Sequence, residues 1–381
     1  MGRLPNIPDI CMILHAVNFD YEMKNYLTLL LLSFFMRMDA QDSARKRPLQ
    51  MSGYAETYYV KDFNNPEGKK RAGFLYNHNR SGEPALNLIY LKAAYTGARL
   101  RTNLALAAGT YMQDNFAAEK GIGKNIYEAN AGIKILRKKE LWVDAGVLSS
   151  HIGFESAAGK DCWTLTRSLM AENSPYYETG IRVSFSSADS KWYFAGLVLN
   201  GWQRIRRLDG SKSISFGTQV TWKPTPGVSF NSSTFIGNDR PDSLKRMRYF
   251  HSFYGIFPLS SLLTATAGLD AGMEQVSKGS TRMNTWYSPV LILRLATSRK
   301  TTVAARVEYY SDKQGIIIAT GTANGFQVWG LSANFDVHFT ENIIWRTEAR
   351  NFSSRDPIFP KESGPSQGSN FFATTAFLIG F

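Results

Sequence analysis

The sequence predicts an all-β protein, a transmembrane antiparallel up-and-down β-barrel of about sixteen strands. Three observations carry this prediction: alternating apolar and polar residues, connections that alternate between short and long, and an aromatic-rich but polar composition. The 381 residues include 24 Phe, 18 Tyr and 8 Trp, yet their mean hydropathy is −0.24. Strands whose two faces meet different media produce this combination, because successive side chains point to opposite faces.

Period-two alternation recurs from Ser52 onward. In Gly325–Phe339 the apolar side chains of Leu331 and Phe335 alternate with polar ones such as Asp336. A Lys or Arg on the lipid face costs about 2–4 kcal/mol at the bilayer midplane, so we assign the charge-bearing face to the lumen. The opposite face is then apolar nearly everywhere. The same alternation is found in Ala98–Tyr111, Val303–Tyr309 and Asn342–Phe352.

The connections between these segments alternate in length. Short periplasmic turns and long external loops are typical of outer-membrane barrels, whereas a soluble sandwich or propeller has no reason for this alternation. The short connections are expected near 95–97, 137–140, 188–191, 224–227, 257–261, 298–301 and 339–342. The long connections are expected near 62–84, 112–126, 151–176, 203–212, 237–247, 273–282, 311–324 and 353–369.

The beginning of the chain has the pattern of a leader. The apolar run Tyr26–Met36 is much shorter than the ~20 residues that a transmembrane helix needs. Lys24 precedes this run and Ala40 follows it, which is the order of regions in a cleaved secretory signal peptide. The alternative is a buried N-terminal helix.

The expected organisation of the chain follows from this leader. Residues 1–22 contain more acidic groups than a secretion leader tolerates, so we expect a mis-assigned start there and a signal peptide over 23–40. A short segment at 41–50 then leads to a single barrel at 51–381.

The lumen face carries the candidate pore-lining residues. Rings of charge select ions in pores, but basic and acidic groups nearly balance on this face, so we expect at most a slight anion preference. The alternative is that these residues pair across strands and only stabilise the wall. The candidates are Arg99, Arg101, Lys134, Arg182, Arg294, Arg306, Glu308, Asp336, Arg346 and Glu348.

The long connection at 151–176 carries Trp163 and Leu165, which a fully solvated loop does not need. We therefore hypothesise that it folds into the barrel and narrows it. The alternative is an external cap packed on neighbouring loops. In the constriction hypothesis, loop residues face Arg101, Arg182, Arg306 or Arg346. These loop residues are Glu155, Asp161, Arg167 and Glu172.

The last apolar segment is expected to close the barrel by pairing with the strand that begins near Ser52. A free edge in hydrocarbon would leave backbone groups unpaired at several kcal/mol each. Phe377 and Ile379 would face lipid, and Phe381 would lie at the interface. Together these three residues resemble the C-terminal signal that barrel-assembly machinery recognises in outer-membrane proteins.

Motifs for catalysis, metals and cofactors are missing from the sequence. The five histidines have no metal-ligand spacing, and Gly153–Lys160 has the wrong glycine spacing for a phosphate-binding loop. His151 with the nearby Ser149, Ser150 and Ser156 is the one candidate for a hydrolase site. The basic residues are scattered among acidic ones, so a nucleic-acid partner is not expected. We expect no cofactor, no metal and no enzyme activity.

Several blocks resemble the OmpL-like β-barrel porins of gram-negative bacteria. They are FLYNHNRSGEPALN (Phe74–Asn87), NLALAAGTYMQDNF (Asn103–Phe116) and the segment Ser150–Gly180, and the opening strand Ser52–Tyr59 is similar too. The resemblance implies an outer-membrane barrel for passive diffusion of small hydrophilic solutes. It implies no particular site residues.

The expected function is thus an outer-membrane channel whose partners are membrane lipid, the barrel-assembly machinery and small solutes. An oligomer is left open. One alternative is a non-conducting structural or adhesion barrel, and a second is an outer-membrane hydrolase.

Overall fold

The computed structural model describes residues 48–381, which form one compact unit. The predictions for the start of translation, the signal peptide and most of the segment at 41–50 lie outside these residues. The strands are β1 (Leu49–Asp62), β2 (Pro84–Thr96), β3 (Leu100–Ala108), β4 (Ile126–Lys134), β5 (Glu140–Ser149), β6 (Tyr177–Ser186), β7 (Trp192–Leu199), β8 (Ser215–Trp222), β9 (Ser229–Asn238), β10 (Met247–Pro258), β11 (Leu263–Gln275), β12 (Met283–Ala296), β13 (Thr301–Asp312), β14 (Phe326–His338), β15 (Ile343–Ser354) and β16 (Ser369–Gly380).

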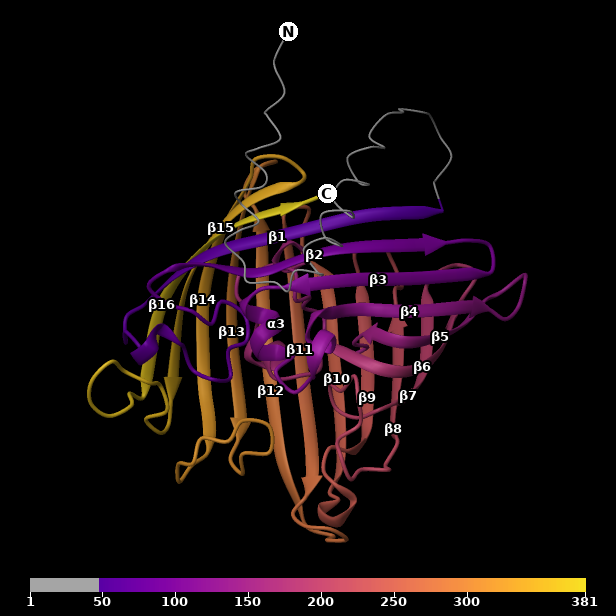
Figure 1. Cartoon of the computed structure of the whole chain (residues 1–381). Coiled ribbons are helices and arrows are strands. Elements are labelled where there is room, and N and C mark those ends of the chain that lie inside the picture. The colour runs from indigo at the N-terminus through magenta and orange to yellow at the C-terminus, as the bar shows by residue number, and fades with distance from the viewer. Residues whose placement is uncertain (1–47) are drawn as a thin grey trace, which may run out of the picture. The chain divides into compact units, whose positions relative to one another are not determined.

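These sixteen antiparallel strands close into a barrel, which confirms the predicted fold class (Figure 1). Each strand pairs with its neighbours in sequence, and β1 also pairs with β16. The closing register sets Tyr54 opposite Gly380 and Tyr58 opposite Ala376. Every strand therefore has a partner on both sides, and the sheet has no free edge.

The period-two pattern of the sequence is the reason for the two faces of the wall. Along β14, exposed and buried residues alternate, with Leu331 56% exposed and Asp336 only 4% exposed. Successive side chains of a strand point to opposite faces, so the apolar set lies outside and the polar set lies inside.

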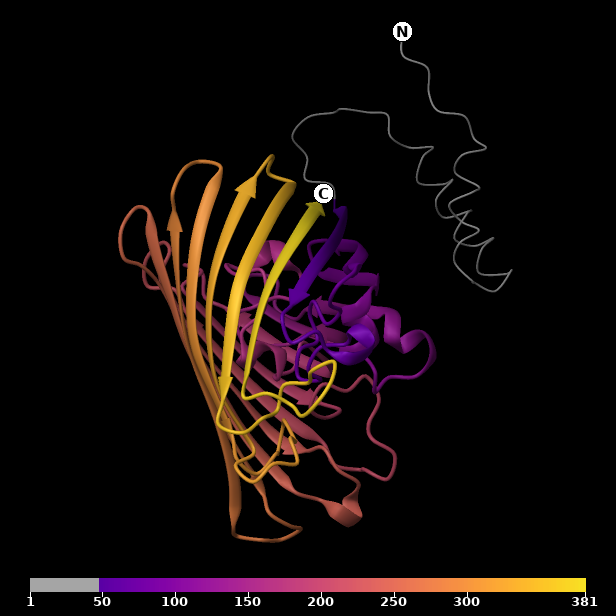
Figure 2. The ribbon, with the colours of Figure 1, turned by 90° about the vertical axis from the view of Figure 1, so that its left-hand side faces the viewer.

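The two ends of the barrel differ in their connections, as predicted. Short connections join the strands at one end and long ones join them at the other (Figure 2, top and bottom). The wall also differs in height around the barrel. The strands β10–β16 have 12–14 residues, whereas β3–β9 have 8–10.

The helices are short and lie in the long connections. They are η2 (Glu67–Lys69), α3 (Thr110–Asn115), η3 (Gly121–Asn125), η4 (Gly159–Asp161), α4 (Leu169–Glu172) and η5 (Asp242–Leu244).

None of the helices in residues 48–381 has the length and apolar character needed to cross a membrane.

The predicted strand at Ala98–Tyr111 is longer than the observed β3. The strand ends at Ala108 because Gly109 has a φ of +126°, and α3 begins directly afterwards. A Cβ atom at Gly109 would lie 2.3 Å from the carbonyl oxygen of Asn87. This bend needs a glycine, which alternation of apolar and polar residues does not reveal.

Candidate functional site: the lumen and its inward loop

The connection between β5 and β6, Ser150–Tyr176, turns into the barrel, and we call it the inward loop. Its residues Leu165, Arg167 and Leu169 are each 0% exposed. It contains η4 and α4, and it packs on the inner face of the tall side of the wall. The loop thus covers the inner face of that side of the wall.

Acceptor groups of the wall bind backbone N–H groups of the inward loop. Glu308 accepts from the Leu169 nitrogen at 2.6 Å, and Glu348 accepts from the Thr166 nitrogen at 2.5 Å. Asn334 on β14 accepts from the Leu165 nitrogen at 3.0 Å. A loop buried inside a barrel needs such partners, because an unpaired buried N–H costs free energy.

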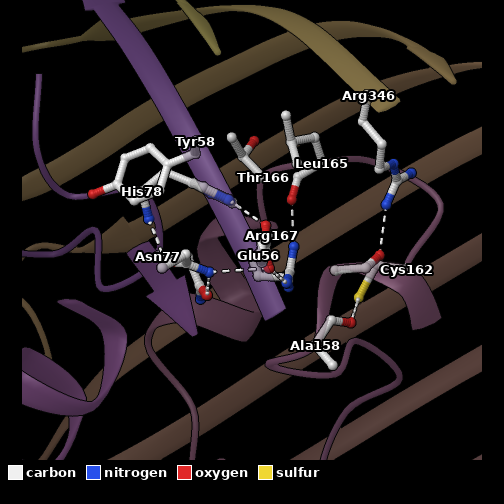
Figure 3. A network of polar contacts seen from close by, with 12 residues as sticks. Glu56, Tyr58, Asn77, His78, Ala158, Cys162, Leu165, Thr166, Arg167 and Arg346 are labelled. Atoms are coloured by element: carbon white, nitrogen blue, oxygen red, sulfur yellow. Dashed lines mark hydrogen bonds and ion pairs between the residues drawn. The ribbon is translucent and has the colours of Figure 1, made fainter. Parts of the chain in front are cut away.

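Donor groups of the wall bind carbonyl groups of the same loop. Arg346 donates to the Gly159 oxygen at 2.6 Å (Figure 3), and Arg306 donates to the Thr166 oxygen at 2.7 Å. Arg350, a lumen residue outside the predicted site set, donates to the Arg167 oxygen at 2.8 Å. The charges of β13–β15 therefore anchor the loop.

The same wall residues also pair with one another. Arg306 lies 2.8 Å from Glu348 and 3.2 Å from Glu308, and Arg346 lies 2.7 Å from Asp336. Their side chains are at most 5% exposed. Because each charge has a buried counter-charge, this part of the wall presents almost no charge to solvent.

The charged residues of the inward loop do not pair with the wall arginines named in the constriction hypothesis, except for Glu155. Glu155 lies 3.9 Å from Arg306. Arg167 donates to the carbonyl oxygens of Ser156 and Ala157, and it lies 4.0 Å from Glu56 of β1 (Figure 3). Arg167 thus mainly holds the loop's own shape.

Glu172 binds another connection instead of a wall arginine. Its carboxylate accepts from the backbone nitrogen of Tyr76 at 2.8 Å and from that of Asn77 at 3.2 Å. Burial raises the pKa of Glu172 to about 7, against the lowering effect of these N–H groups and of Arg167. Asp161 is exposed at the tip of the loop, and among the described residues no wall arginine forms an ion pair with it.

The connection between β1 and β2 also enters the lumen, which the sequence analysis missed. His78 is fully buried and its Nε2 atom lies 2.6 Å from Glu56 (Figure 3). Phe74 packs against Phe326 and Phe359 with ring centroids 4.8 and 6.1 Å apart. The apolar residues around Phe74 could have predicted this inward position, because apolar residues in a long connection also led to the prediction of the inward loop.

The wall formed by β2–β6 has its charges arranged differently. Arg101 and Arg182 both bind Asp144, at 2.5 and 3.2 Å, and Lys92 binds Glu128 at 2.5 Å. The cation side chains are 28%, 22% and 29% exposed, whereas Asp144 is 1% and Glu128 is 9% exposed. Each pair therefore turns its cation toward the lumen and buries its carboxylate; we call Lys92, Arg101 and Arg182 the cation strip.

The three remaining predicted lining residues lie near the short-connection end. Lys134 lies 2.5 Å from Glu140, and Arg294 is half-buried on the lumen side of β12. Arg99 requires a correction: it is exposed in the turn before β3 and is no part of the wall. Its carbonyl oxygen accepts from the Lys134 nitrogen, so the hydrogen bonds between the two chain segments end at Arg99, one residue before β3 begins.

His151 of the inward loop is buried against the inner face of the wall, and both ring nitrogens have partners. Its Nδ1 atom lies 2.7 Å from Glu178, and its Nε2 atom lies 2.8 Å from the Thr234 carbonyl oxygen. The hydroxyls of Ser150 and Ser156 instead accept from backbone N–H groups. Within residues 48–381, no cluster of His, Cys, Asp and Glu side chains could hold a metal ion.

A closed antiparallel barrel with an apolar exterior, a charged lumen and an inward loop is the architecture of bacterial porins. The family model described as "Putative beta-barrel porin-2, OmpL-like" matches residues 48–381. The chain therefore belongs to this OmpL-like porin family. None of the curated proteins compared with the sequence matches it.

Solved structures of porins share the fold at low sequence identity. An anion-selective porin from Comamonas acidovorans aligns with a TM-score of 0.58 and 10% identity, covering 87% of this chain and 99% of that one. The trimer form of in-vitro folded OmpT from Vibrio cholerae aligns with a TM-score of 0.56 and 9% identity, covering 87% of this chain and 99% of that one. OprB from Pseudomonas putida aligns with a TM-score of 0.54 and 9% identity, covering 88% of this chain and 94% of that one.

Proposed function

We propose that this protein is a passive channel of the outer membrane for small hydrophilic solutes, with a slight preference for anions. The solutes pass along the open wall of β2–β6, opposite the part of the lumen that the inward loop covers. The observation that carries this proposal is the cation strip, in which Lys92, Arg101 and Arg182 are partly exposed while their carboxylate partners are buried.

The preference for anions is slight because the lumen charges are mostly paired. A unit charge about 10 Å from an ion in water changes its energy by about 0.4 kcal/mol, roughly a twofold change in local concentration. The buried carboxylates of Glu128 and Asp144 offset part of this effect. The wall at Arg306 and Arg346 adds little, because those charges are neutralised and covered.

In this proposal the channel is narrowed by the inward loop, which carries Glu155, Asp161, Arg167 and Glu172. Most of these residues position the loop, since their partners lie in the loop, in β1 or in the β1–β2 connection. Asp161 differs, because it is exposed at the tip and meets the solutes together with the exposed Lys160.

The experiment that tests the proposal is conductance of the purified protein in planar bilayers that separate two KCl concentrations. We expect stepwise channel openings and a reversal potential whose sign corresponds to excess chloride permeation. A protein that inserts as a folded barrel but never conducts would instead be the structural or adhesion barrel. A reversal potential of the opposite sign would overturn the assigned role of the cation strip.

The hydrolase alternative finds no support in the arrangement around His151. Both ring nitrogens of His151 are occupied by Glu178 and by the Thr234 carbonyl group, so the ring has no free nitrogen to activate a serine. A non-enzymatic channel is therefore the favoured function.

Three further features belong to this proposal. The chain is exported through a cleaved signal peptide at 23–40, and barrel-assembly machinery inserts it into membrane lipid with Phe377, Ile379 and Phe381 as the recognised end. The assembled barrel forms an oligomer. The trimer form of the Vibrio cholerae OmpT fold relative supports the last point only by likeness of fold.

A further inference from the structure

A row of polar and small residues crosses the outer face of β7–β10, where neighbouring residues are apolar. Strand pairing sets Gly196 beside Thr218, Thr218 beside Thr234, and Thr234 beside His251. Ser232 lies on the same outer face. We call Gly196, Thr218, Ser232, Thr234 and His251 the outer polar row.

The polar row lies inside the apolar belt and not at its edge. Toward the long-connection end it is followed by an outward row of Val198, Phe216, Ile236 and Tyr249. Toward the short-connection end the next outward row contains Phe194, Val220 and Phe253, together with Ser232, which joins the polar row through its hydrogen bond to His251. Trp192 and Trp222 follow beyond it. His251 is thus an ionisable side chain that faces the hydrocarbon part of the membrane.

Acyl chains cannot satisfy these polar groups. The row has two internal hydrogen bonds, one between the hydroxyls of Thr218 and Thr234 at 2.7 Å and one between Ser232 and His251 Nε2 at 2.8 Å. Each hydroxyl keeps a lone pair free, and the imidazole has a second ring nitrogen. Polar residues within a membrane belt typically face another protein segment instead of lipid.

Gly196 supplies an independent observation. Its φ is not positive, and a Cβ atom there would meet no atom within 4 Å. Neither backbone conformation nor packing within the barrel therefore needs a glycine at this position. Glycine inside a strand weakens it and often marks the place where another backbone approaches closely.

We propose that the outer face of β7–β10 is a contact surface for a second copy of this chain. Gly196 allows the two walls to approach, and the polar rows of the two copies form hydrogen bonds across the contact. A second copy fits because hydroxyl and imidazole groups are both donors and acceptors, so the row is complementary to itself. This inference rests on the proposed outer-membrane location and deepens the proposed oligomer.

Disulfide trapping in native outer membranes tests the contact. Thr218→Cys places a thiol in the row, and a thiol on the second copy bonds to it only when the Cα atoms lie within about 7 Å. We expect oxidation to give a covalent dimer of this chain. The matched control is Ala333→Cys on the exposed outer face of β14, which should stay monomeric. The unsubstituted protein controls for Cys162, which is buried.

A second variant separates the contact from folding. Gly196→Leu in the Thr218→Cys protein fills the open space outside the wall and should abolish the dimer while the barrel stays folded and conducting. Three results would overturn the proposal. One is cross-linking of the Ala333→Cys protein to the same extent as the Thr218→Cys protein, and another is a dimer that persists after Gly196→Leu. The third result is a mixed disulfide between Thr218→Cys and a different protein. Channel recordings on the same preparations test the proposed channel function independently of the contact. Loss of the dimer with normal conductance, or the reverse, therefore shows which of the two proposals has failed.

Discussion

At the scale of single residues, the position of a carboxylate decides how a basic lumen residue acts. Arg101 and Arg306 are both arginines on the lumen face, and both are paired with acids. Arg306 is covered and bonds to the inward loop, whereas Arg101 is 28% exposed above a buried Asp144 and beside the Trp142 ring at 4.4 Å. Only the second arrangement presents charge to a passing ion.

The first prediction concerns this difference. The double change Arg101→Gln and Arg182→Gln leaves Asp144 without its two cations, so the reversal potential in a KCl gradient should shift toward cations by roughly twofold or more in permeability ratio. The control is the double change Lys278→Gln and Arg282→Gln, which removes the same two charges from the exposed β11–β12 connection. An unchanged potential in the double variant would exclude a solute path along this wall.

The second prediction concerns the raised pKa of Glu172, which burial moves to about 7. In the folded state this carboxyl keeps its proton up to about pH 7, whereas in the unfolded state it loses the proton near pH 4.5. The free energy of unfolding therefore falls as pH rises from about 4.5 to 7. The full effect is at most about 3 kcal/mol. Glu172→Gln should flatten this pH dependence of urea unfolding in detergent, measured by tryptophan fluorescence at pH 5 and pH 8. Glu362→Gln, a change at an exposed carboxylate of the β15–β16 connection, is the control.

At the scale of elements, the inward loop and the tall wall depend on each other. The loop's backbone groups bond to Glu308, Glu348 and Arg346, and these side chains lose their partners when the loop is absent. The wall is therefore a scaffold for the loop as much as a lining for the pore.

The third prediction follows from that mutual dependence. Deletion of residues 153–174 should raise single-channel conductance several-fold, because a large part of the lumen becomes free. It should also lower the thermal stability of the barrel, because buried wall charges lose hydrogen bonds. Deletion of 277–281, in the exposed β11–β12 connection, is the control and should change neither the conductance nor the thermal stability. Unchanged conductance in planar bilayers after the first deletion would mean that the loop does not narrow the path.

At the scale of the whole molecule, the seam that closes the barrel between β1 and β16 extends to Phe381. Phe381 donates its N–H to the Gly53 oxygen at 3.0 Å and accepts from the Gly53 nitrogen at 3.1 Å. Its ring covers Gly53, where a Cβ atom would lie 2.3 Å from a ring carbon. The last residue of the chain thus completes the seam between β16 and β1.

The fourth prediction concerns this seam. Deleting Phe381 should reduce the amount of folded barrel in the outer membrane, while the conductance of each inserted channel stays the same. The amount is measured by the heat-dependent mobility of membrane extracts in electrophoresis. Phe371→Ala, at the other end of the same strand, is the control and should have a smaller effect. Normal assembly without Phe381 would contradict its role as an assembly signal.

The barrel, a strand number of about sixteen and the two faces of the wall could be predicted from the residues alone. These follow from period-two alternation and from the high cost of a charge in lipid, both of which act within a single strand. The end of β3 at Gly109 and the position of Arg99 in a turn escaped this reasoning, because strand ends depend on local backbone geometry.

Which lumen charges meet water depends on contacts between distant parts of the chain. Arg101, Arg182, Arg306 and Arg346 have the same alternation in the sequence, yet the first two remain partly exposed and the last two are covered. The cover comes from the inward loop, whose contacts with Glu308, Glu348 and Arg346 join residues more than 130 positions apart. Such contacts depend on where a long loop settles inside a closed wall, and no periodicity within one strand records that.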